Sequence, residues 1–182
     1  MVEILKDAPP DLGITLDAEE EIEGLTRRSD AVAIVRVVDK RSAFTTESSP
    51  PHRVPGDWIK STVTVSVLTV LKDPGARLTE GGSVSFLEDG GELVVADRRV
   101  IAGNAYEVPT RIGETYLMFF WLSKDALQSL GPSWTFRVTG QNLQRLRTDF
   151  DPQRELDSKT LEWAELRVRA KAHLPKPEGA AQ

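Results

Sequence analysis

Three long runs of β-branched and aromatic residues constrain the fold of this chain more than any other feature. Residues 31–38 are apolar except for one arginine, and residues 114–122 hold seven consecutive large apolar side chains at 116–122. Such runs are typical of strands that are buried on both faces. Residues 62–72 alternate valine with threonine or serine until Leu68 and Val70 make both faces apolar. This loss of alternation predicts a bend or bulge in a long strand, residues 58–72.

The segments between these runs predict further short strands and two helices. Asp89-Gly90-Gly91 is a turn signal that predicts a hairpin between residues 83–88 and a return strand, residues 92–101. Residues 133–139 and 141–147 predict two more strands, and residues 123–132 a helical turn. Helical periodicity covers residues 17–28 and 157–174. Strands in hairpin order without alternating helices predict a mostly β fold, an antiparallel OB-type β-barrel with an N-terminal and a C-terminal helix.

The 182 residues predict one domain at 17–174, between an acidic arm at 1–16 and a tail at 175–182. Residues 42–57 form a long polar loop with three prolines, which is either mobile or functional.

Charge and cysteine content exclude several functions. The net charge of -5 comes entirely from residues 1–28, so the neutral remainder disfavours nucleic acid as a partner. The absence of cysteine excludes disulfides and thiolate chemistry. The longest apolar run, residues 116–122, is too short for a membrane helix. The first residues resemble no secretory signal, which indicates a cytoplasmic protein by default, or an extracytoplasmic one if the chain is a processed form.

Residues 29–38, 62–72 and 113–120, followed by 134–140, resemble in this order a group of poorly characterised bacterial proteins. These proteins have a TIMP/netrin-like OB-type β-barrel, so the resemblance implies such a barrel over residues 29–140. The metalloprotease inhibitors of that superfamily place an N-terminal cysteine on the catalytic zinc. This chain has no cysteine, and the inhibitory activity is therefore not carried over.

No catalytic residue, metal ligand or cofactor is predicted. His52 and His173 have no partner at a ligand spacing, and no phosphate-binding glycine motif occurs. Four carboxylates near the Asp89 turn leave a hydrolase on the barrel face as one alternative: Glu88, Asp89, Glu92 and Asp97. A basic face with aromatic residues leaves single-stranded nucleic-acid binding as another: Arg36, Lys40, Arg41, Lys60, Arg98 and Arg99, with Phe44 and Trp58.

Our leading hypothesis is a non-enzymatic binding domain whose partner is a protein. In an OB-type barrel the predicted loops 42–57 and 123–132 would flank the ligand face. The candidate binding residues at this rim are Phe44, Arg53, Trp58 and Trp134.

The C-terminal helix is apolar on two sides and therefore requires two partners. One face carries Leu161, Ala164, Val168 and Ala172, and the other carries Trp163, Leu166, Ala170 and Leu174. The barrel and the N-terminal helix are the expected partners. The alternative is a homodimer through Trp163, Leu166 and Leu174.

Overall fold

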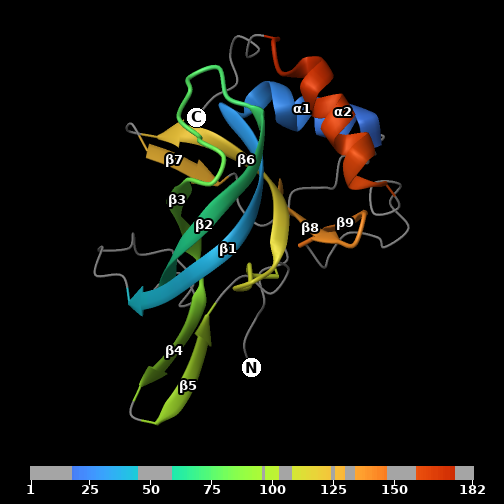
Figure 1. The fold of residues 1–182 in the computed structure, drawn as a ribbon. Helices are drawn as coiled ribbons and strands as arrows, with labels where there is room; N and C mark the ends of the chain where they lie inside the picture. The colour runs from blue at the N-terminus through green and yellow to red at the C-terminus, as the bar shows by residue number, and fades with distance from the viewer. Residues whose placement is uncertain are drawn as a thin grey trace, which may run out of the picture.

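The computed structural model describes residues 18–44, 59–95, 97–102, 108–123, 126–129, 134–146 and 159–174. They form two helices, α1 (Ala18–Arg28) and α2 (Leu161–Lys171), and nine strands (Figure 1). The strands are β1 (Ala31–Phe44), β2 (Ile59–Lys72), β3 (Ser83–Asp89), β4 (Gly91–Val95), β5 (Arg98–Ala102), β6 (Thr115–Ser123), β7 (Ala126–Ser129), β8 (Phe136–Thr139) and β9 (Asn142–Arg145). The predicted mostly β fold is confirmed, and its described residues include two helices.

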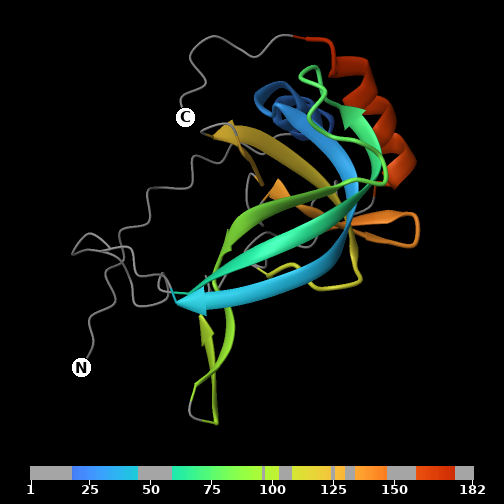
Figure 2. The ribbon, with the colours of Figure 1, turned by 60° about the vertical axis from the view of Figure 1, so that its left-hand side comes forward.

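Seven strands form one antiparallel sheet. Six of them follow the order β3-β2-β1-β6-β8-β9, and the seventh, β7, pairs with β6 outside this path. The edge of β6 that faces away from β1 is shared, because its first half pairs with β8 and its second half with β7. The sheet is strongly curved (Figure 2). Within the described ranges no ladder joins β3 to β7 or β9, so backbone hydrogen bonds do not close the sheet into a barrel.

The central pair β1 and β6 separates two hydrophobic clusters. Ala33 and Val35 of β1 and Met118 of β6 lie in the cluster on the concave side of the sheet. The alternate residues Ile34 and Phe119 lie in the other cluster, which the helices cover. Residues 31–35 of β1 and 116–120 of β6 are therefore buried on both faces, as their continuous apolar runs predict.

The two helices pack against each other over one end of the sheet (Figures 1 and 2). Glu19 of α1 pairs with Arg167 of α2 at 2.5 Å, and Glu23 pairs with Lys171 at 3.0 Å. The buried Glu21 pairs with Arg145 of β9. The N-terminal helix is thus one of the two partners of α2, as predicted.

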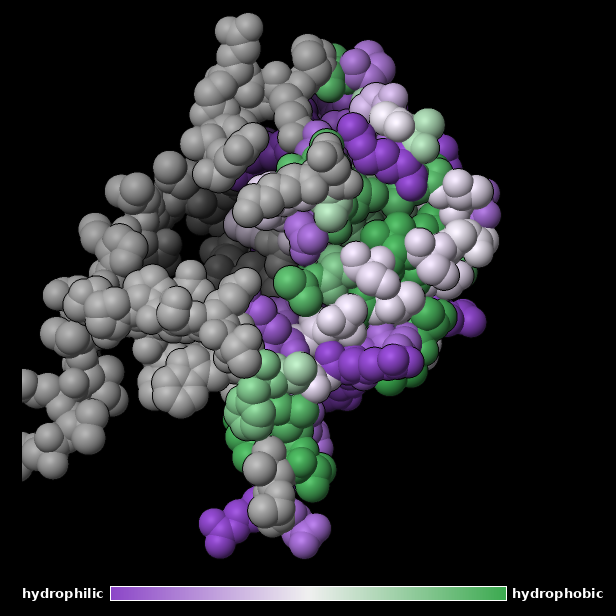
Figure 3. Space-filling model, turned by 90° about the vertical axis from the view of Figure 1, so that its left-hand side faces the viewer, coloured by the Kyte–Doolittle hydropathy of each residue, from purple (hydrophilic) through white to green (hydrophobic). Residues whose placement is uncertain are grey.

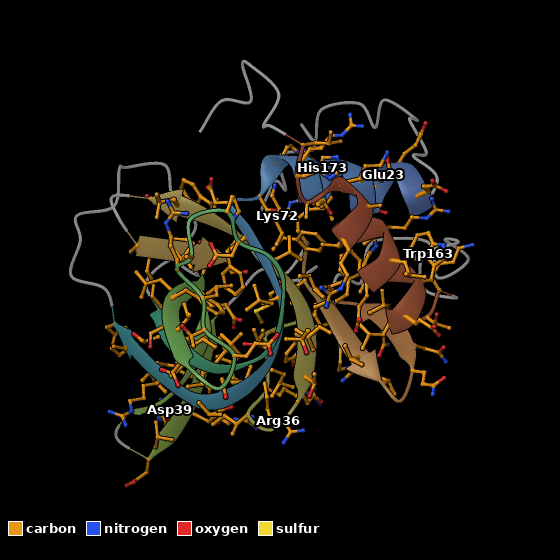
Figure 4. The ribbon with its side chains drawn as sticks, turned by 45° about the horizontal axis from the view of Figure 1, so that its top comes forward. Glu23, Arg36, Asp39, Lys72, Trp163 and His173 are labelled. Atoms are coloured by element: carbon orange, nitrogen blue, oxygen red, sulfur yellow. The ribbon has the colours of Figure 1, made fainter. Side chains whose placement is uncertain are left out.

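A buried lysine fixes the end of α1 to the sheet. Lys72, the last residue of β2, donates to the carbonyl oxygens of Thr26 (2.6 Å) and Ser29 (2.8 Å). A cation at a helix C-terminus is favourable because the last carbonyl groups carry partial negative charge. Figure 4 shows Lys72 beside α1, while Arg36 and Asp39 of β1 lie towards the other end of the sheet.

The predicted irregularity in β2 is confirmed. Val35 pairs with Val67 and Ile34 with Thr69, so Leu68 has no pairing residue of its own on β1. Val38 is the corresponding extra residue on β1, because Val37 pairs with Val65 and Asp39 with the adjacent Thr64. Leu68 and Val38 are both exposed, whereas Leu71, the extra residue at a third register shift, is buried.

Three predictions of secondary structure are wrong. The predicted loop 42–57 begins later, because residues 42–44 still pair with β2. The predicted helical turn within 123–132 is replaced by β7, whose Leu127 packs into the concave cluster. The predicted return strand 92–101 is instead a separate hairpin, β4 and β5, which does not pair with β3.

Other predictions lie outside the described residues, namely the arm 1–16, most of the loop 42–57 and the tail 175–182. Neither described helix is long and apolar enough to cross a membrane.

Candidate functional site

The most distinctive surface feature is the β4–β5 hairpin, which projects from the sheet at the end away from the helices (Figures 1 and 2). It starts where the chain leaves β3 through two glycines with positive φ, 87° at Gly90 and 152° at Gly91. Such angles favour glycine because a side chain would clash with the backbone. The glycine pair that predicts a tight hairpin with β3 therefore directs the chain off the sheet.

Hydrogen bonds to two serines fix the base of the hairpin. The hydroxyl oxygens of Ser42 (β1) and Ser61 (β2) are 2.9 Å apart. Ser61 donates to the carbonyl oxygen of Gly90 at 2.8 Å, and Ser42 accepts from the N–H of Glu92 at 3.2 Å. A Cβ atom on Gly91 would lie 2.3 Å from Oγ of Ser61, so only glycine allows this close approach.

The hairpin carries apolar side chains that the described part of the chain does not cover. Val94 is 72% exposed and Ile101 66%, and these two lie on one face of the ribbon. Val100 (36% exposed) and the half-buried Leu93 face each other on the opposite face. Figure 3 shows a hydrophobic shaft that ends in a hydrophilic tip.

Phe44 extends this apolar surface onto the main sheet. It is the last residue of β1, is 52% exposed and pairs with Ile59. Residues two apart on a strand point to the same face, so Phe44 shares the face of Ser42, which contacts β4. We define the hairpin patch as five residues: Phe44, Leu93, Val94, Val100 and Ile101.

Charged residues of the hairpin surround its apolar shaft. Arg99 pairs with Glu92 at 2.5 Å, and its hydrogen bond holds the pKa of Glu92 below the usual range. Asp97 forms the tip with a φ of 63°. The neighbouring Arg98 is exposed, and none of the ion pairs between described residues includes it.

A buried polar cluster lies just before the hairpin, at the end of β3. Glu88 is 4% exposed and pairs with Lys40 through one carboxylate oxygen. Its other oxygen accepts from the hydroxyl (2.6 Å) and the N–H (3.3 Å) of Thr110, and Lys40 donates to the Thr110 carbonyl oxygen at 3.1 Å. Each oxygen is satisfied within the protein, as a structural ion pair requires.

The structure does not gather the four predicted carboxylates into one site. Glu88 is inside, whereas Asp89, Glu92 and Asp97 are exposed. Asp89 lies 3.9 Å from Lys60, Glu92 pairs with Arg99, and Asp97 lies at the tip.

The predicted basic face is largely balanced by acids. Four of its members form ion pairs: Lys40 with Glu88, Arg41 with Asp39, Lys60 with Asp89 and Arg99 with Glu92. Within the described ranges no group of three potential metal ligands occurs, and His173 is exposed.

The four predicted rim residues do not form one described site. Phe44 lies beside the hairpin, whereas Trp134 packs into the helix-side cluster at the other end of β1, with Arg28 over its ring at 5.7 Å. Arg53 and Trp58 lie outside the described residues, as does His52.

The predicted dimer face of α2 is partly used within the chain. Trp163 is half-buried between Lys159 and Arg167, whose charged groups lie 5.5 and 5.9 Å from its ring. Leu174 is half-buried and Leu166 is 63% exposed. A homodimer through these residues stays a prediction.

The apolar hairpin residues were missed because the segment 92–101 reads as one strand of the main sheet. The signal that could reveal them is Asp97-Arg98-Arg99, three charges that interrupt an apolar run and mark a turn. A scan against models of known protein families gives no match, and a search of curated proteins finds no relative.

Proposed function

We propose that this protein is a non-enzymatic binding domain that contacts a partner protein through the hairpin patch. The observation that carries the proposal is a projecting hairpin with exposed apolar side chains on a fold whose two interior clusters are well packed. Contiguous exposed apolar residues are typical of interaction sites, whereas single ones are common on any surface.

In the described part of the chain, β4 and β5 pair only with each other and have no third strand. An isolated two-stranded ribbon is marginally stable in water and gains stability from a third strand or from packing against another element. The base is fixed by Ser42 and Ser61, but Ile101, opposite Glu92 at the base, and Val94, further along the ribbon, both remain exposed. A partner that covers them would supply both apolar burial and order, and Phe44 offers an aromatic anchor beside them.

We also propose that the curved sheet is an OB-type barrel, as the sequence resemblance implies. The path β3-β2-β1-β6-β7 has the strand order of a five-stranded OB barrel in which β3 and β7 would meet. Two contacts support it: β3 and β7 lie close together, and the Leu87 N–H donates to Oε1 of Gln128 at 3.3 Å. Amide-to-amide nuclear Overhauser effects between β3 and β7 in solution would test it, and their absence would contradict closure.

The test of the binding function compares the hairpin patch with an equally exposed apolar residue elsewhere. Val94→Ser with Ile101→Ser changes the patch, and Ile112→Ser in the turn before β6 is the matched control. Each protein would be used to capture partners from the source cells by chemical cross-linking. We expect a specific partner that the wild type and the Ile112→Ser variant recover and the patch variant loses.

Both variants change exposed side chains, so circular dichroism should show an unchanged fold for each. If the patch variant recovers the same partners in the same amounts as the control, the hairpin patch is not the contact surface.

A further inference from the structure

We infer that the partner supplies an extended segment that adds as a third strand to the outer edge of β5. This inference rests on the proposed binding function and identifies the chemistry of the partner at the hairpin patch. Three observations carry it: the free edge, apolar side chains on both faces, and the charges along β5.

The free edge belongs to β5 rather than to β4. At its base β4 lies against β1 and β2, and the Glu92 N–H donates to Ser42. In the described part of the chain β5 pairs with β4 alone. In an antiparallel ribbon, alternate residues direct their N–H and C=O groups away from the partner strand. The outer edge of β5 therefore presents main-chain groups that an added strand can use.

The distribution of apolar side chains favours a strand over a helix as the bound element. A helix would lie on one face of the ribbon and leave the other face exposed. Ile101 lies on one face and Val100 on the other. An added strand also alternates its side chains between the faces, so it places one beside each of these residues.

The charges along β5 favour an acidic segment over a second copy of this chain. β5 contains Arg98 and Arg99 and no acid, and Arg99 is already paired with Glu92. β5 itself offers no carboxylate to a second copy, whereas an acidic segment would place a carboxylate beside Arg98. Opposite charges on neighbouring strands are favourable.

The occupant is therefore an extended segment of another protein with apolar side chains beside Val100 and Ile101 and a carboxylate beside Arg98. Insertion into a lipid surface is disfavoured, because the tip of the hairpin carries Asp97 and Arg98 rather than apolar side chains.

The test uses the full chain and synthetic peptides. The probe is an eight-residue peptide with two adjacent valines to lie beside Val100 and Ile101, threonine at most other positions, and one glutamate near the end that reaches Arg98. One control replaces that glutamate by lysine. A second carries an N-methyl group on every peptide nitrogen, so neither of its edges can donate to a ladder. Fluorescence anisotropy would measure binding, and amide hydrogen exchange by NMR would report protection of β5.

We expect the glutamate peptide to protect amides of β5 and the N-methylated peptide to protect none. The lysine peptide should bind about two- to fivefold more weakly than the glutamate peptide. Arg98→Gln should abolish this difference while leaving ladder formation intact.

Three results would overturn strand addition: no protection of β5, equal binding of the N-methylated peptide, or protection by phosphatidylcholine–phosphatidylserine vesicles instead of peptides. If the peptides fail but the Val94→Ser, Ile101→Ser variant still loses its captured partner, strand addition is wrong and the binding function stands. If that variant loses no partner, the binding function itself has failed.

Discussion

Replacement of Lys40 by methionine should destabilise the fold strongly, because it leaves a carboxylate buried without its cation. The side chains of Lys40 and Glu88 are only 13% and 3% exposed. Removal of one partner of a buried ion pair costs about 3–5 kcal/mol, since the remaining charge has neither water nor a counter-ion. The Thr110 donors still bind Glu88, but they are neutral and cannot replace the ammonium group.

The neighbouring residue provides the control. Arg41 pairs with Asp39 at 2.8 Å on the same strand, but the two side chains are 83% and 43% exposed. Arg41→Met should therefore cost about 0–1 kcal/mol. The double variant Lys40→Met, Glu88→Gln removes both charges and keeps an acceptor for Thr110, so it should recover at least about 2 kcal/mol.

Urea unfolding, followed by tryptophan fluorescence at 25 °C, measures these differences. For a slope near 2 kcal/mol per molar urea, Lys40→Met should lower the midpoint by about 1.5–2.5 M. The reasoning would be refuted if Lys40→Met and Arg41→Met differed by less than about 1 kcal/mol, or if the double variant were no more stable than Lys40→Met alone.

Two further predictions follow from the same structure. Gly91→Ala should lower the free energy of unfolding by about 1–3 kcal/mol, because its Cβ would meet Oγ of Ser61 at a strained φ. Gly140→Ala is the control, because Gly140 has a φ of 62° but a Cβ there would meet nothing within 4 Å. In the same urea assay it should lower the free energy of unfolding by less than Gly91→Ala does. An equal loss would exclude the contact with Ser61 as the cause. Burial, with a hydrogen bond to Glu114, raises the pKa of Tyr116 above its ordinary value of about 10. Above about pH 10 the unfolded chain loses the Tyr116 proton while the folded state keeps it. The free energy of unfolding is therefore highest below that pH and decreases as the pH rises. Tyr116→Phe should flatten this fall in unfolding measured from about pH 9 to 11, and identical pH profiles would contradict the assignment.

Sequence pattern predicted the centre of this fold well, because burial on both faces leaves a strong signal. The apolar runs of β1 and β6 can be satisfied only between two layers, and the structure provides a cluster on each side. The bulge at Leu68 was also predictable, because a bulge interrupts the alternation of side chains and the interruption is visible in the sequence.

The candidate site was less predictable, because it depends on contacts between distant segments. Gly90 and Gly91 signal a turn, but its direction depends on Ser42 and Ser61, which come from other strands. Nothing in the local sequence indicates that Glu88 is buried, because its partners Lys40 and Thr110 lie 48 and 22 positions away. Local patterns do not contain these pairings, so the segment 92–101 was assigned to the wrong sheet.

The pairing of β1 with β6 has a consequence for synthesis of the chain on the ribosome. β2 can pair with β1 soon after it emerges, but the other edge of β1 must wait for residues 115–120. At about 5–20 residues per second that delay lasts several seconds, during which an apolar strand edge is open to other nascent chains. The helix-side cluster forms later still, because Ala164 and Val168 belong to the last described element. Until α2 has been synthesised, the apolar face of the sheet that α2 covers stays exposed to solvent. We therefore expect the nascent chain to depend on chaperones that bind apolar surfaces and strand edges.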